Sequence, residues 1–191
     1  IHQSLETSNI IICLIRSAHL AIIRQREKNL DHDISLNNFG YNLHYINSIE
    51  AIAHKIVTIV NTTGIPKETV RRKLKKLVER EFIIVNKNKE YYWHLTEERE
   101  KFFIKIMKND IKALAKFTSN IVKYINLNLD QKDIEEEIEK QFSFYFYHFL
   151  NCQLTWLKMW QDKIEDIDLV LVSLQTLIPT LQYAERNLNL K

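Results

Sequence analysis

Apolar residues recur every three or four positions along most of the chain, which is the spacing of one face of an α-helix. This pattern predicts helices over residues 5–28, 39–54, 97–126 and 167–187. The pattern changes around residues 82–95, where β-branched and aromatic residues form two short runs. Such runs are typical of strands. The chain is therefore expected to be mainly α-helical, with one small β-hairpin.

A tight turn separates two helices in the middle of the chain. Gly64 supplies the backbone freedom of a turn, and Pro66 presets the φ angle of a helix start. A helix is thus expected over residues 66–80. Its apolar stripe consists of Val70, Leu74, Leu77 and Val78.

The residues on either side of this turn extend the pattern. Thr58 is placed to cap a short helix over residues 59–63, and residues 55–57 favour a short strand before it. Polar residues 86–90, which include two asparagines, favour a turn between the two predicted strands. Two helices joined by a short turn with a glycine form a helix-turn-helix. With the hairpin, residues 37–96 are predicted to be a winged helix-turn-helix domain.

Positive charge is concentrated in this stretch. Residues 55–89 contain ten Lys or Arg and three Asp or Glu, a net +7, whereas the rest of the chain carries −4. At about 100° per residue, the face of the predicted helix opposite the apolar stripe is mostly cationic. That face holds Glu68, Thr69, Arg71, Arg72, Lys75 and Lys76. Such a local field attracts a polyanion.

The stretch TGIPKETVRRKLKKLVEREFI resembles the recognition-helix segment of bacterial winged-helix transcription regulators of the MarR and GntR kind. Four residues match the pattern of those families: Thr69, Val70, Arg72 and Leu77. The resemblance covers about residues 46–96. Glu81 stands where those families usually have Gly, and a left-handed backbone there costs about 1 kcal/mol for other residues. The helix is therefore expected to end differently in this chain.

The resemblance implies a regulator that binds double-stranded DNA as a homodimer, and the residues divide by expected contact. Side chains expected in the major groove, where Arg matches the two acceptors of guanine, are Arg71, Arg72 and Lys75. Phosphate contacts are expected of Lys67, Thr69 and Lys76, and Thr58 is also expected among the DNA-binding residues. At the hairpin tip, Lys87 and Lys89 reach the backbone or the minor groove. Glu68 accepts a hydrogen bond from cytosine or caps the helix start.

Long helices are expected on both sides of this domain. Residues 1–36 form a support or dimerisation helix, and residues 97–191 form a helical bundle. Within that bundle Asp130 caps a helix that begins acidic and becomes aromatic from Phe142 onward. So many aromatic side chains exceed one small core, and the excess favours a dimer interface or, alternatively, a pocket for a small-molecule effector. A row of lysines over residues 101–116 is a solvated face or a set of flanking phosphate contacts.

Other chemistry finds little support in the chain. The His-Asp cluster at residues 31–33 lacks a second half with ligand spacing, and His148 and Cys152 are expected in packed core, so no metal or cofactor is predicted. No Gly-rich phosphate loop or nucleophile elbow is present, so an enzyme is not expected. The two cysteines indicate a reducing compartment, and no apolar run reaches the length of a membrane span. A cytoplasmic, nucleoid-associated protein is expected; the alternatives are a protein-docking winged helix and a nonspecific architectural DNA binder.

Overall fold

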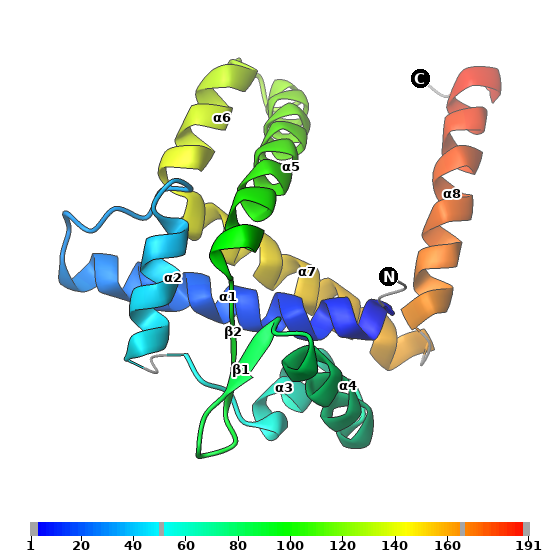
Figure 1. Ribbon diagram of the computed structural model, residues 1–191. Coiled ribbons are helices and arrows are strands. Elements are labelled where there is room, and N and C mark those ends of the chain that lie inside the picture. The colour runs from blue at the N-terminus through cyan, green and yellow to red at the C-terminus, as the bar shows by residue number, and fades with distance from the viewer. Residues whose placement is uncertain (1–3, 50–51, 165–166, 189–191) are drawn as a thin grey trace.

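The computed structural model describes residues 4–49, 52–164 and 167–188 (Figure 1). Its elements, in chain order, are α1 (Leu5–Lys28), α2 (Phe39–Ser48), α3 (Ile56–Thr63), α4 (Lys67–Glu79), β1 (Ile83–Val85), β2 (Tyr91–Trp93), α5 (Glu97–Lys123), α6 (Gln131–Lys140), α7 (Phe142–Ile164) and α8 (Ile167–Leu188). The described chain is thus mainly helical with a small antiparallel sheet. This confirms the class that the hydrophobic pattern predicts.

Helix α1 runs through the middle of the molecule (Figure 1). Its buried residues Ile10, Leu14, Ala18 and Ile22 recur every four positions, so one stripe faces the core. The helix packs along α7 and also contacts α2, α3 and β2. By length and composition alone α1 could cross a membrane, and half of its most apolar window is buried inside the protein.

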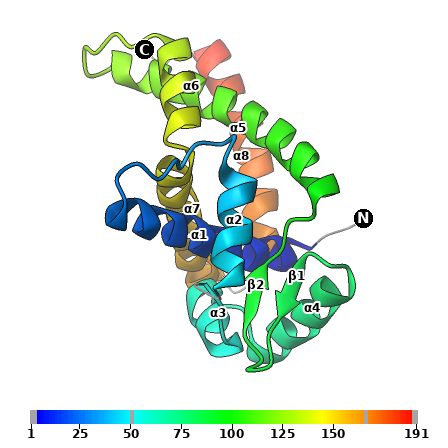
Figure 2. The same ribbon diagram turned by 60° about the vertical axis from the view of Figure 1, so that its left-hand side comes forward.

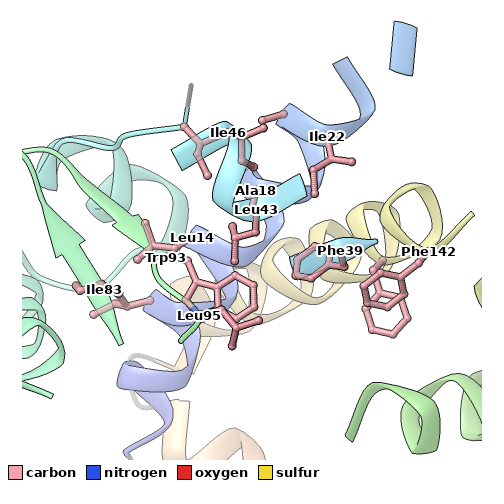
Figure 3. Packing of buried hydrophobic residues seen from close by; sticks show 14 of the residues in the cluster. Leu14, Ala18, Ile22, Phe39, Leu43, Ile46, Ile83, Trp93, Leu95 and Phe142 are labelled. Carbon is pink, nitrogen blue, oxygen red and sulfur yellow. The ribbon is translucent and has the colours of Figure 1, made fainter. Parts of the chain in front are cut away.

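The centre of the core is an aromatic cluster around Phe39 of α2 (Figure 3). The ring centroid of Phe39 lies 4.8 Å from that of His19, 5.3 Å from Phe142, 5.4 Å from Phe103 and 5.8 Å from Trp93. These residues belong to α1, α7, α5 and β2. The cluster therefore joins the small sheet to the long helices in one core.

The sheet is extended by one isolated bridge. Strand β1 pairs antiparallel with β2, with Ile84 opposite Tyr92. On the other side of β2, the backbone N–H groups of His54 and Tyr91 each donate to the other's carbonyl oxygen at 2.8 Å. The strand predicted at residues 55–57 is wrong, because the extended chain pairs at His54 and turns into α3 immediately afterwards.

Two predicted helix boundaries are also wrong. Helix α3 begins at Ile56, so Thr58 is an exposed residue of its first turn and not its cap. Helix α2 ends at Ser48, although apolar residues continue to Ala53 and the sequence predicts a helix to residue 54. The chain leaves the helix early because it must reach the extended bridge at His54. Apolar spacing alone does not reveal that tertiary demand.

The aromatic helix does not continue from the acidic one as predicted. The helix is interrupted at Gln141, between α6 and α7. The loop after α1 binds on both sides of this break: the Leu36 N–H donates to the Glu139 carbonyl oxygen at 3.0 Å, and the Ser143 N–H donates to that of Ile34 at 3.1 Å. These distant hydrogen bonds replace those of a continuous helix.

Further details of the flanking helices bear on the predictions. The Asp130 side chain accepts a hydrogen bond from the Lys132 N–H at 2.7 Å, which confirms the predicted cap. Pro179 lies inside α8 and does not interrupt it. His148 and Cys152 are exposed, so their predicted place in packed core is wrong. They share α7 with buried aromatic residues because successive residues of one helix point to different faces.

Candidate nucleic-acid interface

The turn between α3 and α4 depends on Gly64. Its φ of 74° is left-handed, and its N–H donates to the Val60 carbonyl oxygen at 2.8 Å. The Thr63 hydroxyl donates to the Ile59 carbonyl oxygen at 2.8 Å and accepts the Ile65 N–H at 3.3 Å. These local bonds satisfy polar groups of the turn, in which Thr63 and Ile65 are buried. Helix α4 then begins at Lys67, one residue after the predicted start.

One face of α4 is fixed by burial. Val70 and Leu74 are fully buried and Leu77 is 2% exposed, so the predicted apolar stripe packs into the core. From α7, the Lys158 ammonium donates to the Asn61 carbonyl oxygen at 2.8 Å and so holds the end of α3. The orientation of α4 is therefore set by its own apolar residues and by the support of α3.

The opposite face of α4 presents unpaired cations. Arg72, Lys75 and Lys76 are exposed, and within the described part of the chain they form no ion pair or side-chain hydrogen bond. Lys67 is exposed at the helix start, and Thr69 is half-buried beside the apolar stripe. These three unpaired cations remain free to meet an external anion.

Arg71 and Glu68 form a pair on the same surface. The Arg71 Nη1 atom lies 2.8 Å and 2.9 Å from the two carboxylate oxygens of Glu68. Both side chains are more than half exposed, so solvent weakens the pair and a competing anion can replace it. The predicted cap by Glu68 is wrong, because its carboxylate makes no bond to the helix start.

Lys73 ties the start of α1 to the flank of α4. Its side chain is 13% exposed and its Nζ atom lies 2.9 Å from the Glu6 carboxylate, with a further hydrogen bond to the Ser4 hydroxyl. Beside it is a pocket of about 250 Å³. The polar residues around it are Ser4, Thr7, Arg72, Lys73, Lys76 and Arg80. Arg80 is not among the residues expected to contact DNA, although its position four residues after Lys76 places the two side chains on one face of the helix.

Beyond the last residue of α4, Glu79, the chain leaves the helix through Glu81, which has the left-handed conformation that glycine usually supplies. The φ of Glu81 is 56°, and its N–H donates to the Val78 carbonyl oxygen at 2.9 Å. The next N–H, of Phe82, donates to the Leu77 carbonyl oxygen at 3.0 Å. This pair of bonds is the Schellman motif. The expectation of a different helix end is therefore wrong: the geometry is kept without the glycine.

Arg99 of α5 supports this helix end. Its guanidinium donates to the Glu81 carbonyl oxygen at 2.7 Å and to that of Arg80 at 3.0 Å. The same group lies 4.3 Å from the centroid of the Phe82 ring, within cation–π range. These contacts stabilise the strained residue and hold the entry into β1.

The tip of the hairpin carries two exposed lysines, Lys87 and Lys89. The Asn86 side-chain oxygen accepts the N–H groups of Asn88 and Glu90 at 3.0 Å each, which closes the turn. Lys89 has a left-handed φ of 57°. Helices α3 and α4 and the hairpin tip lie at one end of the molecule (Figures 1 and 2). The structure thus gathers the predicted cations of α4 and of the hairpin at that end, with Thr58 exposed on α3.

The remaining cations and the apolar grooves lie elsewhere. The lysine row of α5 is exposed along a helix that leads away from α3 and α4 in Figure 1. One apolar groove of about 500 Å³ lies between α5, α6 and α7, and another of about 710 Å³ lies between α1, α5 and α7. Phe149 and Leu114 line both grooves. Among the described residues, no group of three His, Cys, Asp or Glu side chains is placed to hold a metal ion.

Comparisons of the chain with protein-family models, with curated proteins and with solved structures found no match.

Proposed function

We propose that this protein is a sequence-specific DNA-binding regulator of the winged helix-turn-helix class. Helix α4 enters the major groove, and the hairpin tip contacts the backbone or the minor groove. The observation that carries the proposal is the two-sided character of α4. Its apolar face is buried, while Arg72, Lys75 and Lys76 project from the opposite face and have no side-chain partner among the described residues.

The dimensions of α4 suit this role. Its 13 residues span about 20 Å at 1.5 Å per residue, and a major groove about 12 Å wide admits one helix. Arg72 lies near the middle of the exposed face, and no described residue forms an ion pair with it. A free guanidinium can donate to both acceptors of guanine, which is the commonest specific contact in the groove.

The surroundings of α4 provide phosphate contacts. The pocket beside it combines the charges of Lys76 and Arg80 with the hydroxyls of Ser4 and Thr7. Phosphate oxygens accept hydrogen bonds from such groups, and these contacts set the register of the protein on the duplex. On the hairpin, Lys87 adds positive charge at the same end of the molecule.

The experiment that tests the proposal is selection from a random duplex pool with the purified chain at two salt concentrations. Enrichment of an inverted repeat, with half-sites about one helical turn apart, is the expected result for a homodimer. Affinity should fall about 10³-fold or more between about 50 and 200 mM salt if six or more phosphates are contacted.

Two other outcomes would refute this function. Strong salt dependence without an enriched sequence would indicate a nonspecific architectural DNA binder. Absence of DNA binding at both salt concentrations would indicate a protein-docking winged helix, whose cationic face contacts solvent and no nucleic acid.

A further inference from the structure

Helix α8 is an apolar helix with little of the protein around it. It follows α7 and touches the start of α1, and along most of its length it stands apart from α5 and α6 (Figure 1). Six of its large apolar side chains are between 49% and 68% exposed: Leu169, Val172, Leu177, Ile178, Leu181 and Tyr183. No charged residue occurs over the sixteen positions 169–184. A helix of this composition is normally buried.

The sequence of α8 follows a heptad repeat. Apolar residues occupy the seven positions 167, 170, 174, 177, 181, 184 and 188, with alternating steps of three and four. This spacing gives a seam on one side of the helix, as in helices that pack along one another. Gln175 and Gln182 lie one position after the seam residues of their heptads, and Pro179 lies opposite the seam. Of the seam residues, Leu177 and Leu181 are 49% and 58% exposed.

The accessible surface area of the chain is larger than that of a compact monomer of the same mass. The accessible area is 12769 Å². A compact monomer of the same 22.9 kDa mass exposes about 9,600 Å². The excess is about 3,200 Å² per chain, and obligate homodimers bury about 2,000–5,000 Å² in total. The surplus surface of two chains is thus ample for a stable dimer.

We infer that α8 is the dimerisation helix, and that its heptad seam is covered by a second copy of this chain. A second copy fits because both partners bring the same uncharged apolar surface, so no charge is buried unpaired. The helix is about 33 Å long at 1.5 Å per residue, long enough for several heptad layers. The inference deepens the proposed function, and rests on it for the purpose of the dimer, which is to present two α4 helices to one duplex.

The test is the solution mass of the full chain by light scattering, from low to high micromolar concentration. The wild type should have a mass of about 46 kDa, twice that of one chain. The variant Leu177→Glu/Leu181→Glu places two charges on the seam. It should weaken the dimer about 100-fold and give a monomer. Both leucines are about half exposed in the single chain, so its circular dichroism should keep the wild-type helix content.

A matched control is Gln175→Glu/Gln182→Glu, which adds the same two charges to the same helix away from the seam. It should remain a dimer. If the charged seam variant does not fold, Leu177→Ala/Leu181→Ala provides the same test, with an expected weakening of about 10-fold.

A wild type that stays monomeric at the highest concentration would overturn the inference, and so would a seam variant that dimerises as strongly as the control. If that monomeric wild type also floats with neutral phosphatidylcholine vesicles, a lipid surface covers α8 instead of a second copy. None of these masses depends on DNA, so a dimer that binds no DNA would refute the proposed function and leave the α8 interface standing.

Discussion

His19 makes the protein sensitive to acid through a single buried group. Its side chain is fully buried among the rings of Phe39, Phe142 and Phe146, at centroid distances of 4.8, 5.2 and 6.1 Å. Neither ring nitrogen has a hydrogen-bond partner among the described residues. Burial lowers the pKa of His19 from 6.5 to about 3, because the charged imidazolium loses its hydration there.

The size of the effect follows from this pKa. The folded state holds His19 neutral, whereas the unfolded state binds a proton below pH 6.5. The contribution of neutral His19 to the free energy of unfolding is therefore fully present above pH 6.5, and it is lost as the pH falls towards 3. At 1.36 kcal/mol per pH unit, the loss at about pH 4.5 is about 2.7 kcal/mol.

The perturbation is His19→Leu, which has a similar volume and no titratable group. Urea unfolding followed by circular dichroism at about pH 7.5 and about pH 4.5 measures the loss for each protein. The wild type should lose about 2.7 kcal/mol more than the variant over this interval. At neutral pH the variant should be more stable by about 1–3 kcal/mol, because two unsatisfied polar atoms are removed.

The exposed His148 provides the matched control. His148→Leu should keep the acid loss of the wild type, because its ring is already in contact with water. If His19→Leu and the wild type lose the same free energy of unfolding between the two pH values, His19 is not buried as a neutral group and the reasoning fails.

Three other predictions concern α4 and its surroundings. Glu81→Gly should raise the free energy of unfolding by about 1 kcal/mol and the melting temperature by about 2–4 °C, since glycine adopts the left-handed φ freely; an unchanged or lower melting temperature would contradict this. Gly64→Ala should lower the free energy of unfolding by about 1–2 kcal/mol, because alanine is strained at the left-handed φ of this position; denaturant unfolding measures the loss. Arg72→Ala should weaken binding to the selected operator by about 1–3 kcal/mol and relax its sequence preference, whereas Lys87→Ala should weaken all duplexes alike; equal small losses on every sequence would exclude the division of roles.

The sequence by itself determined the features that depend on near neighbours. The turn at Gly64 and the cap at Asp130 rest on contacts within a few positions, and the start of α1 and the apolar spacing of α4 are local patterns of the sequence. Helical periodicity and turn chemistry act over the same short distances, so these elements can be predicted from the sequence. The surplus of positive charge around α4 is likewise a matter of composition.

Only the tertiary structure decided where those elements stop and what they touch. The break at Gln141 depends on Leu36, and the helix end at Glu81 depends on Arg99, which lies 18 positions away. Lys73, on the flank of α4, is paired with Glu6 and with Ser4, 69 positions earlier. The sequence spacing of such partners carries no signal, because only the packed core brings them within hydrogen-bond distance. The sequence therefore predicts a cationic helix, whereas the fold determines which of its cations are paired with other side chains.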